Sequence, residues 1–249
     1  MKQIYFLLSF VILNEYMHAN EYYTYDKIES TLHAWQNDYG YSTHPIFSDY
    51  GIIYNLDTIG YSSQIDLPIF AVKLSADADL PKQDKPRILI LGQCHAEEIY
   101  GVEISMKIIE CFLDPEQCFY DYYNIRPYLL NILENSLEKV ELWVVPTHNP
   151  EGLKVVHGYC NDGSSETVVE CGSNGGEWIE DQTYRKNISD ANNNGTFIEG
   201  QDWERNVGYD EDGVDLNRNY DINWIFGDEL LEEGNSCNHD YDDAYDYYR

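Results

Sequence analysis

The chain has 249 residues, with 45 acidic and 15 basic side chains and a formal net charge of −30 at pH 7. This length forms one large domain or two small ones, and 43% hydrophobic residues exclude a disordered chain. The negative charge argues against nucleic acid and anionic membrane surfaces as partners, and no apolar run reaches the roughly 18–20 residues that span a bilayer.

The first 19 residues have the layout of a secretory signal peptide. Lys2 gives a positive start, apolar to neutral residues run from Ile4 to Leu13, and Ala19 is a small residue suited to cleavage. A buried N-terminal strand or helix is the alternative. We therefore expect residues 1–19 to be removed, residues 20–249 to form the folded part, and the protein to be secreted or periplasmic.

Helical and strand patterns alternate through the next part of the chain. Thr24 is suited to cap a helix and Gly40 to end it, and continuous aliphatic runs are typical of strands buried on both faces of a sheet. The order of the elements predicts an α/β sandwich. In chain order we expect a helix over 24–40, short strands within 46–75, a buried strand over 87–91, helices over 97–113 and 127–138, and a buried strand over 140–145.

Residues 151–214 lose this pattern and become rich in Gly, Asn, Asp and Ser. We expect an irregular segment here, and irregular segments of this length are usually functional or are held by disulfides or metal. Within it, Asp190, Asn192 and Asn194 have the spacing of a calcium loop, although Gln201 at the twelfth position excludes an EF-hand. A solvated Asn/Asp turn is the equal alternative.

Export to an oxidising compartment permits disulfides. Six cysteines allow 15 pairings, which the sequence alone does not decide. We favour Cys160 with Cys171, which bracket a Gly/Ser/Asn-rich loop, and then Cys111 with Cys118. Cys94, inside a predicted strand, is expected to be a buried thiol.

His95 and Glu98 directly follow the aliphatic run 87–91 in the spacing H-x-x-E. Open α/β sheets place their ligands where a strand's carboxyl end leads into a helix. Imidazole and carboxylate are both suitable zinc ligands, but two alone do not complete a site. The pattern by itself is common, so further segments must support a metal site here.

Two further segments supply this support. Residues 143–152 end the next predicted strand with Asn149-Pro150-Glu151-Gly152, and residues 213–219 read Gly-Val-Asp-Leu-Asn-Arg-Asn. With Gln93-Cys94-His95-Ala96-Glu97-Glu98, they resemble the zinc carboxypeptidases of the carboxypeptidase A/B type. That family's pattern runs G-x-H-A-R-E, N-P-D-G, a loop Arg, and G-V-D-x-N-R-N. The resemblance covers roughly residues 22–249 and implies a mixed β-sheet flanked by helices.

The resemblance implies roles for matching residues of this chain. His95 and Glu98 correspond to the first two ligands of a zinc cofactor, and Asp215 to the carboxylate that accepts the second imidazole N–H of His95. Asn217 and Arg218 correspond to the pair that binds the terminal carboxylate of a peptide or protein substrate.

Arg185 corresponds to the arginine that stabilises the developing oxyanion. Lys186 and Arg205 compete for this assignment, because a long insertion precedes the segment.

The chain departs from the family pattern in two places. Glu97 stands where the family usually has Arg, which would weaken contacts to the substrate upstream of the cleaved bond. The family's third zinc ligand and general-base Glu follow a stretch that begins Y-R-G-P, and here Tyr248-Arg249 are the last residues. We therefore expect a C-terminally truncated form that lacks its final strands. His239 is a weak substitute for the third ligand.

These observations favour a secreted zinc metallocarboxypeptidase that removes C-terminal residues from peptides. One alternative is a non-catalytic secreted module that binds peptide C-termini through Arg218 and Asn217. The other is a zinc-dependent deacylase on the same scaffold.

Overall fold

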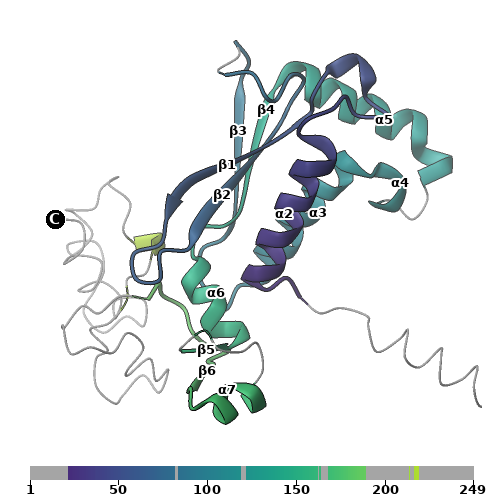
Figure 1. Ribbon diagram of the computed structural model, residues 1–249. Coiled ribbons are helices and arrows are strands. Elements are labelled where there is room, and N and C mark those ends of the chain that lie inside the picture. The colour runs from purple at the N-terminus through teal and green to yellow at the C-terminus, as the bar shows by residue number, and fades with distance from the viewer. Residues whose placement is uncertain are drawn as a thin grey trace, which may run out of the picture.

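A four-stranded mixed sheet forms the centre of the computed structural model (Figure 1). Its order is β1 (Tyr54–Tyr61), β2 (Pro68–Leu74), β4 (Glu141–Thr147) and β3 (Arg87–Gln93). The β1–β2 and β2–β4 pairs are antiparallel, whereas β3 and β4 are parallel, with Gln93 opposite Thr147. The carboxyl ends of β3 and β4 therefore lie side by side.

The structure describes residues 22–81, 84–118, 122–161, 163, 168–188, 213 and 216–218. The predicted signal peptide, the candidate calcium residues Asp190, Asn192 and Asn194, and also Asp215 and His239 lie outside these residues.

The large helices cover one face of the sheet. Figure 1 shows α2 (Tyr25–Tyr39), α3 (Tyr100–Leu113) and α5 (Tyr122–Lys139) on the same side of the strands. Their apolar side chains and those of β2 and β4 form one buried cluster, which stabilises this part of the fold. The predicted mixed sheet with flanking helices is confirmed.

Helix α2 begins and ends where the sequence predicts. The Thr24 hydroxyl accepts a hydrogen bond from the Lys27 amide at 3.3 Å, and the Gly40 amide donates to the Gln36 carbonyl at 2.9 Å. The Tyr54 hydroxyl on β1 donates to the Leu32 carbonyl at 2.9 Å. The helix is thus fixed to the sheet by both packing and hydrogen bonds.

The strand predicted over 87–91 is present as β3, but it is not buried on both faces. Among the described residues β3 is an edge strand that pairs with β4 alone, and Ile88, Leu89 and Leu91 are exposed, Leu89 by 61%. An aliphatic run sets strand propensity but does not determine how many neighbours the strand has. Gly92 is required next to β4, because a Cβ there would lie 2.1 Å from the Pro146 carbonyl oxygen.

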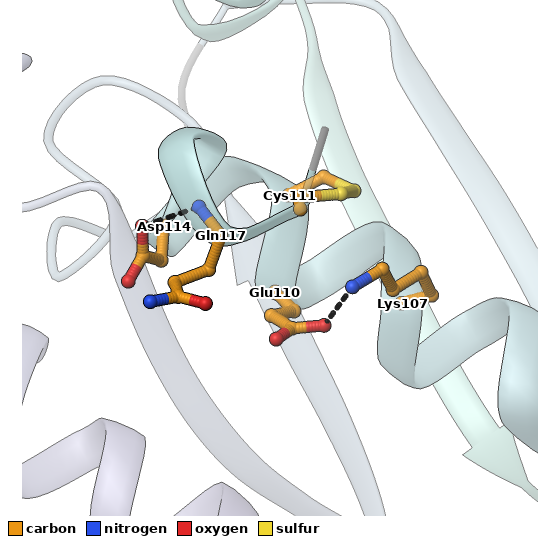
Figure 2. The surroundings of a disulfide bond; sticks show 6 residues. Lys107, Glu110, Cys111, Asp114 and Gln117 are labelled. Atoms are coloured by element: carbon orange, nitrogen blue, oxygen red, sulfur yellow. Dashed lines mark hydrogen bonds and ion pairs between the residues drawn. A yellow bond between two sulfur atoms is a disulfide. The ribbon is translucent and has the colours of Figure 1, made fainter. Parts of the chain in front are cut away.

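The predicted Cys111–Cys118 disulfide is present and joins the end of α3 to α4 (Pro115–Cys118). Figure 2 shows its surroundings, where Asp114 accepts a hydrogen bond from the Gln117 amide at 3.1 Å and caps α4. Lys107 and Glu110 form an ion pair one turn earlier on α3. The disulfide therefore closes a tight turn between two helices.

The segment expected to be irregular contains regular structure. It holds α6 (Pro150–His157), β5 (Tyr159–Cys160), α7 (Val168–Asn174) and β6 (Trp178–Ile179). Pro150 occupies the first turn of α6, and the Asn149 side chain caps it by accepting from the Gly152 amide. The predicted Cys160–Cys171 disulfide joins β5 to α7.

Cys94 directly follows β3 and is partly buried, rather than buried inside the strand as the sequence predicts. In the part of the chain that the structure describes, no helix is long and apolar enough to cross a membrane.

Candidate active site

The carboxyl ends of β3 and β4 are joined by polar contacts. Thr147 donates a hydrogen bond to the Gln93 side chain, and the Gln93 amide group donates to the Ala96 carbonyl at 3.1 Å. The backbone amide of His148 donates to the Gln93 carbonyl at 3.2 Å. Hydrogen bonds to the end of β4 therefore hold the first residues of the loop that carries His95.

His95 and Glu98 lie together in this loop, before α3 begins at Tyr100. The predicted helix over 97–113 therefore starts later than expected, and Glu98 lies in the turn that precedes it. His95 Nδ1 is 3.1 Å from Glu98 Oε1, and His95 is 6% exposed whereas the Glu98 side chain is 61% exposed. The buried His95 imidazole, which is held in place, thus faces the exposed Glu98 carboxylate, which is free to rotate.

A segment far along the chain, residues 184–188, packs against the same loop. The Ala96 amide donates to the Arg185 carbonyl at 3.0 Å, and the Asn149 side chain donates to the carbonyls of Cys94 and Lys186 at 3.0 and 2.9 Å. Below them is a small buried cluster of Ala96, Val155, Val156, Tyr184 and Ile188. These contacts bring Arg185 to the His95 loop.

Arg185 forms an ion pair with Glu97, with Nη1 3.2 Å from Oε1. Burial raises the pKa of the Glu97 carboxyl above its usual value, and Arg185 opposes that rise. The other Glu97 oxygen, Oε2, is buried and has no hydrogen-bond partner in the described part of the chain. The departure from the family pattern at position 97 therefore places a carboxylate directly on the predicted oxyanion-stabilising arginine.

His148 is a site residue that the sequence analysis did not single out. Both of its ring nitrogens are buried, and neither has a hydrogen-bond partner among the residues that the structure describes. Burial, and then the positive charge of His95, lower the pKa of His148 below its usual value. A single histidine matches no motif. The sequence feature that could have identified His148 is its position directly after β4, the strand expected to end beside the H-x-x-E loop.

The predicted carboxylate-binding residues lie in the 3-10 helix η2 (Leu216–Arg218), where Asn217 is exposed. Their approach to His95 remains a prediction, as does the role of Asp215.

The donor chemistry of the loop fits zinc. A buried imidazole nitrogen and a carboxylate oxygen are both ligands that zinc accepts, and a catalytic site needs three protein ligands. Within the described residues, no three His, Cys, Asp or Glu side chains lie close enough together to hold a metal ion. A zinc ion bound at His95 and Glu98 would therefore need one further protein ligand.

A family model described as zinc carboxypeptidase matches residues 44–248. No curated protein matches the chain. A solved structure of thrombin activatable fibrinolysis inhibitor is 18% identical with a TM-score of 0.50, over 89% of this chain and 39% of that one; this likeness shows the shared fold.

Two further solved structures are similar. The bovine thrombin-activatable fibrinolysis inhibitor, in complex with tick carboxypeptidase inhibitor, is 18% identical with a TM-score of 0.48, over 89% of this chain and 50% of that one. Carboxypeptidase A from Helicoverpa armigera is 16% identical with a TM-score of 0.47, over 82% and 35%. The chain spans half or less of the length of these three structures.

Proposed function

The chain belongs to the zinc carboxypeptidase family, whose model matches residues 44–248, and from this premise we propose that it is a metallocarboxypeptidase that hydrolyses C-terminal residues from peptides. The observation that carries the proposal is the meeting of His95, Glu98 and Arg185 at the carboxyl ends of β3 and β4. Arg185 lies about 90 positions after His95 in the sequence, so its position beside His95 and Glu98 is not a consequence of chain proximity and supports a shared function.

His95 and Glu98 hold the zinc ion in this proposal, and Asp215 fixes the tautomer of His95 by accepting its second N–H. When bound, a zinc ion at His95 and Glu98 would supply Lewis acidity for the scissile carbonyl and for a water molecule. Burial of His95 keeps competing water away from the imidazole.

The other residues bind and orient the substrate. Arg218 forms two parallel hydrogen bonds with the substrate's terminal carboxylate and Asn217 adds a donor, which selects peptides with a free C-terminus. Arg185 stabilises negative charge on the carbonyl oxygen. Because Glu97 already neutralises part of the Arg185 charge, a substrate must draw the guanidinium away from that carboxylate.

The proposed setting is extracellular or periplasmic. Both predicted disulfides are present, which fits an oxidising compartment. In this proposal residues 1–19 are the signal peptide and residues 20–249 belong to the catalytic domain, with calcium held by Asp190, Asn192 and Asn194. Added calcium should then raise the melting temperature by binding the native state.

The test uses paired peptides that differ only in a free or amidated C-terminus. In a form extended through the family's third zinc ligand and general-base Glu, the zinc-loaded protein should bind the free form and release its last amino acid, and it should do neither with the amidated form. Arg218→Ala should raise KM, whereas Arg185→Ala should mainly lower kcat. Equal cleavage of both peptides would contradict the proposal.

The same measurements separate the alternatives. Binding of the free form without amino-acid release would indicate a binding module for peptide C-termini. Hydrolysis of N-acyl amino acids in place of peptides would indicate a deacylase.

A further inference from the structure

The ion pair between Glu97 and Arg185 lies at the surface of the candidate site. The side chains of the two residues are 29% and 32% exposed, so a peptide that reaches the site can contact both. The Ala96 amide donates to the Arg185 carbonyl at 3.0 Å, which holds the two backbone segments together. Glu97 therefore stays at the site when the Arg185 guanidinium turns toward another group.

The two carboxylate oxygens of Glu97 have different surroundings. Oε1 is 3.2 Å from Arg185 Nη1, whereas Oε2 is buried and has no hydrogen-bond partner among the described residues. Glu98, the other carboxylate of this loop, is a zinc ligand in the proposed function. Glu97 is therefore the carboxylate of the loop that remains for contact with the substrate.

Binding of a substrate changes the partner of Glu97. In the proposed function, the carbonyl oxygen of the substrate draws the Arg185 guanidinium away from Glu97 Oε1. A partly buried carboxylate that loses a charged partner without replacement is unfavourable. Because Oε2 has no partner in the described part of the chain, it does not compensate for this loss. A substrate that brings its own cation offsets the loss, whereas a neutral or acidic substrate does not.

We propose that Glu97 is a specificity-determining residue that selects peptides with Lys or Arg immediately upstream of the cleaved bond. The inference rests on the proposed function, because it assumes that Arg185 binds the scissile carbonyl. The cationic side chain of the substrate takes the place of Arg185 at Oε1 and donates a charge-assisted hydrogen bond there.

The direction of this preference follows from the charge at position 97. Asn217 and Arg218 hold the terminal carboxylate in the proposed function, so Glu97 is left to contact the part of the peptide upstream of its last residue. An arginine at position 97, as in the family pattern, would repel a basic side chain, whereas Glu97 attracts it. The departure from the family pattern thus inverts the charge that the site favours.

Glu110 provides a matched control. Its side chain is 33% exposed, close to the value for Glu97, and it also forms an ion pair through one oxygen, with Lys107 at 2.6 Å. Glu110 lies on α3, outside the loop that carries His95. Glu110→Gln therefore removes the same charge from an equivalent ion pair without changing the site.

The experiment measures peptide binding to the zinc-loaded full chain by competition with a fluorescent peptide. The peptides are N-acetylated, have a free C-terminus and differ only in the penultimate residue, which is Lys, Glu or norleucine, an uncharged side chain with the same carbon stem as Lys. The Lys peptide should bind about three- to tenfold more tightly than the norleucine peptide, as expected for a partly exposed ion pair. Glu97→Gln should remove this advantage, and Glu97→Arg should favour the Glu peptide. Glu110→Gln should keep the advantage of the parent.

The ratio of the two affinities is compared within each protein, so partial unfolding of a variant lowers both affinities and leaves the ratio unchanged. A Lys advantage that persists in Glu97→Gln, or that falls equally in Glu110→Gln, would overturn the inference. Equal affinity for the Lys and norleucine peptides in the parent, with free C-termini still bound more tightly than amidated ones, would overturn this inference alone. No preference for free C-termini would overturn the proposed function as well.

Two further measurements test the exchange of partners. In Arg185→Ala the Lys advantage should grow, because Glu97 Oε1 no longer has its arginine partner before the peptide binds. Loss of the advantage in this variant would overturn the inference. Moving Lys to the last position of the peptide should give a smaller advantage than the penultimate position, and a larger one would contradict the upstream assignment.

Discussion

Two buried histidines show how differently the helix-covered core and the carboxyl edge of the sheet are built. His44, in the core, is 2% exposed, has Nε2 2.8 Å from the Leu113 carbonyl, and accepts at Nδ1 from the amides of Ile46 and Phe47. His148, at the edge, makes no hydrogen bond through either ring nitrogen to any residue that the structure describes. Within the described residues, the core thus satisfies the polar atoms of its histidine, whereas the edge leaves those of His148 without a partner.

The largest expected effect comes from the core. Leu32 on α2 is fully buried in the main cluster. Leu32→Ala should lower the free energy of unfolding by about 2–5 kcal/mol through lost burial and the cavity left behind. Urea titration measures the loss, and Leu80→Ala, at an exposed position, is the control with a change within about 0.5 kcal/mol. An equal loss in both variants would contradict the position of Leu32 in the core.

The next prediction applies one substitution to both histidines. His44→Leu should destabilise the protein by about 1–3 kcal/mol, because it leaves the Leu113 carbonyl and two amides buried without their partner. His148→Leu should be neutral or stabilising, because it removes two polar atoms that have no partner among the described residues. Denaturant unfolding gives both values. Destabilisation of similar size in both variants would contradict the conclusion that the two histidines differ in their hydrogen bonding.

The pH dependence of stability follows from the same histidines. Burial lowers the pKa of His44 and of His148, so the unfolded chain binds protons that the folded chain does not. The free energy of unfolding should therefore be highest above the unfolded histidine pKa of about 6.5 and fall as the pH drops below it, by at most about 1.4 kcal/mol per pH unit for each proton. Unfolding titrations from pH 7.5 to 5 measure this slope. His44→Leu should reduce it, and an unchanged slope would assign the effect to other groups.

The smallest effect concerns a link between the two regions. Lys154 on α6 contacts Asp26 on α2 at 2.9 Å, and the Asp26 side chain is largely exposed. Lys154→Met should lower the free energy of unfolding by only about 0.2–1 kcal/mol, with the difference vanishing at high salt. A larger loss that does not change with salt would contradict the assignment of this contact as a weak surface ion pair between α2 and α6.

The sequence predicts the helix-covered part well because its signals are local. Thr24 and Gly40 bound α2 through contacts within one turn. The prediction that β3 is buried on both faces was wrong. The exposure of Leu89 depends on which strands and helices lie beside β3, and an aliphatic run does not specify them. The helix α6 was not predicted because it has only eight residues, too few for a clear helical period, and a Gly- and Ser-rich stretch follows it.

The candidate site could be predicted in part. His95 and Glu98 were predicted from their position after an aliphatic run together with the two further motif segments, and the structure places His95 Nδ1 3.1 Å from Glu98 Oε1. The Glu97–Arg185 ion pair and the unpartnered nitrogens of His148 could not be predicted, because each depends on contacts between segments far apart in the chain.

The exposed edge of β3 has a consequence for how the protein behaves in concentrated solution. A strand that pairs on one side alone among the described residues, and that carries exposed Ile88, Leu89 and Leu91, is a template on which strands of other molecules can add. The net charge of −30 keeps such molecules apart by mutual repulsion. Since the range of that repulsion shrinks to roughly 3 Å at 1 M salt, we expect added salt to promote edge-to-edge association through β3.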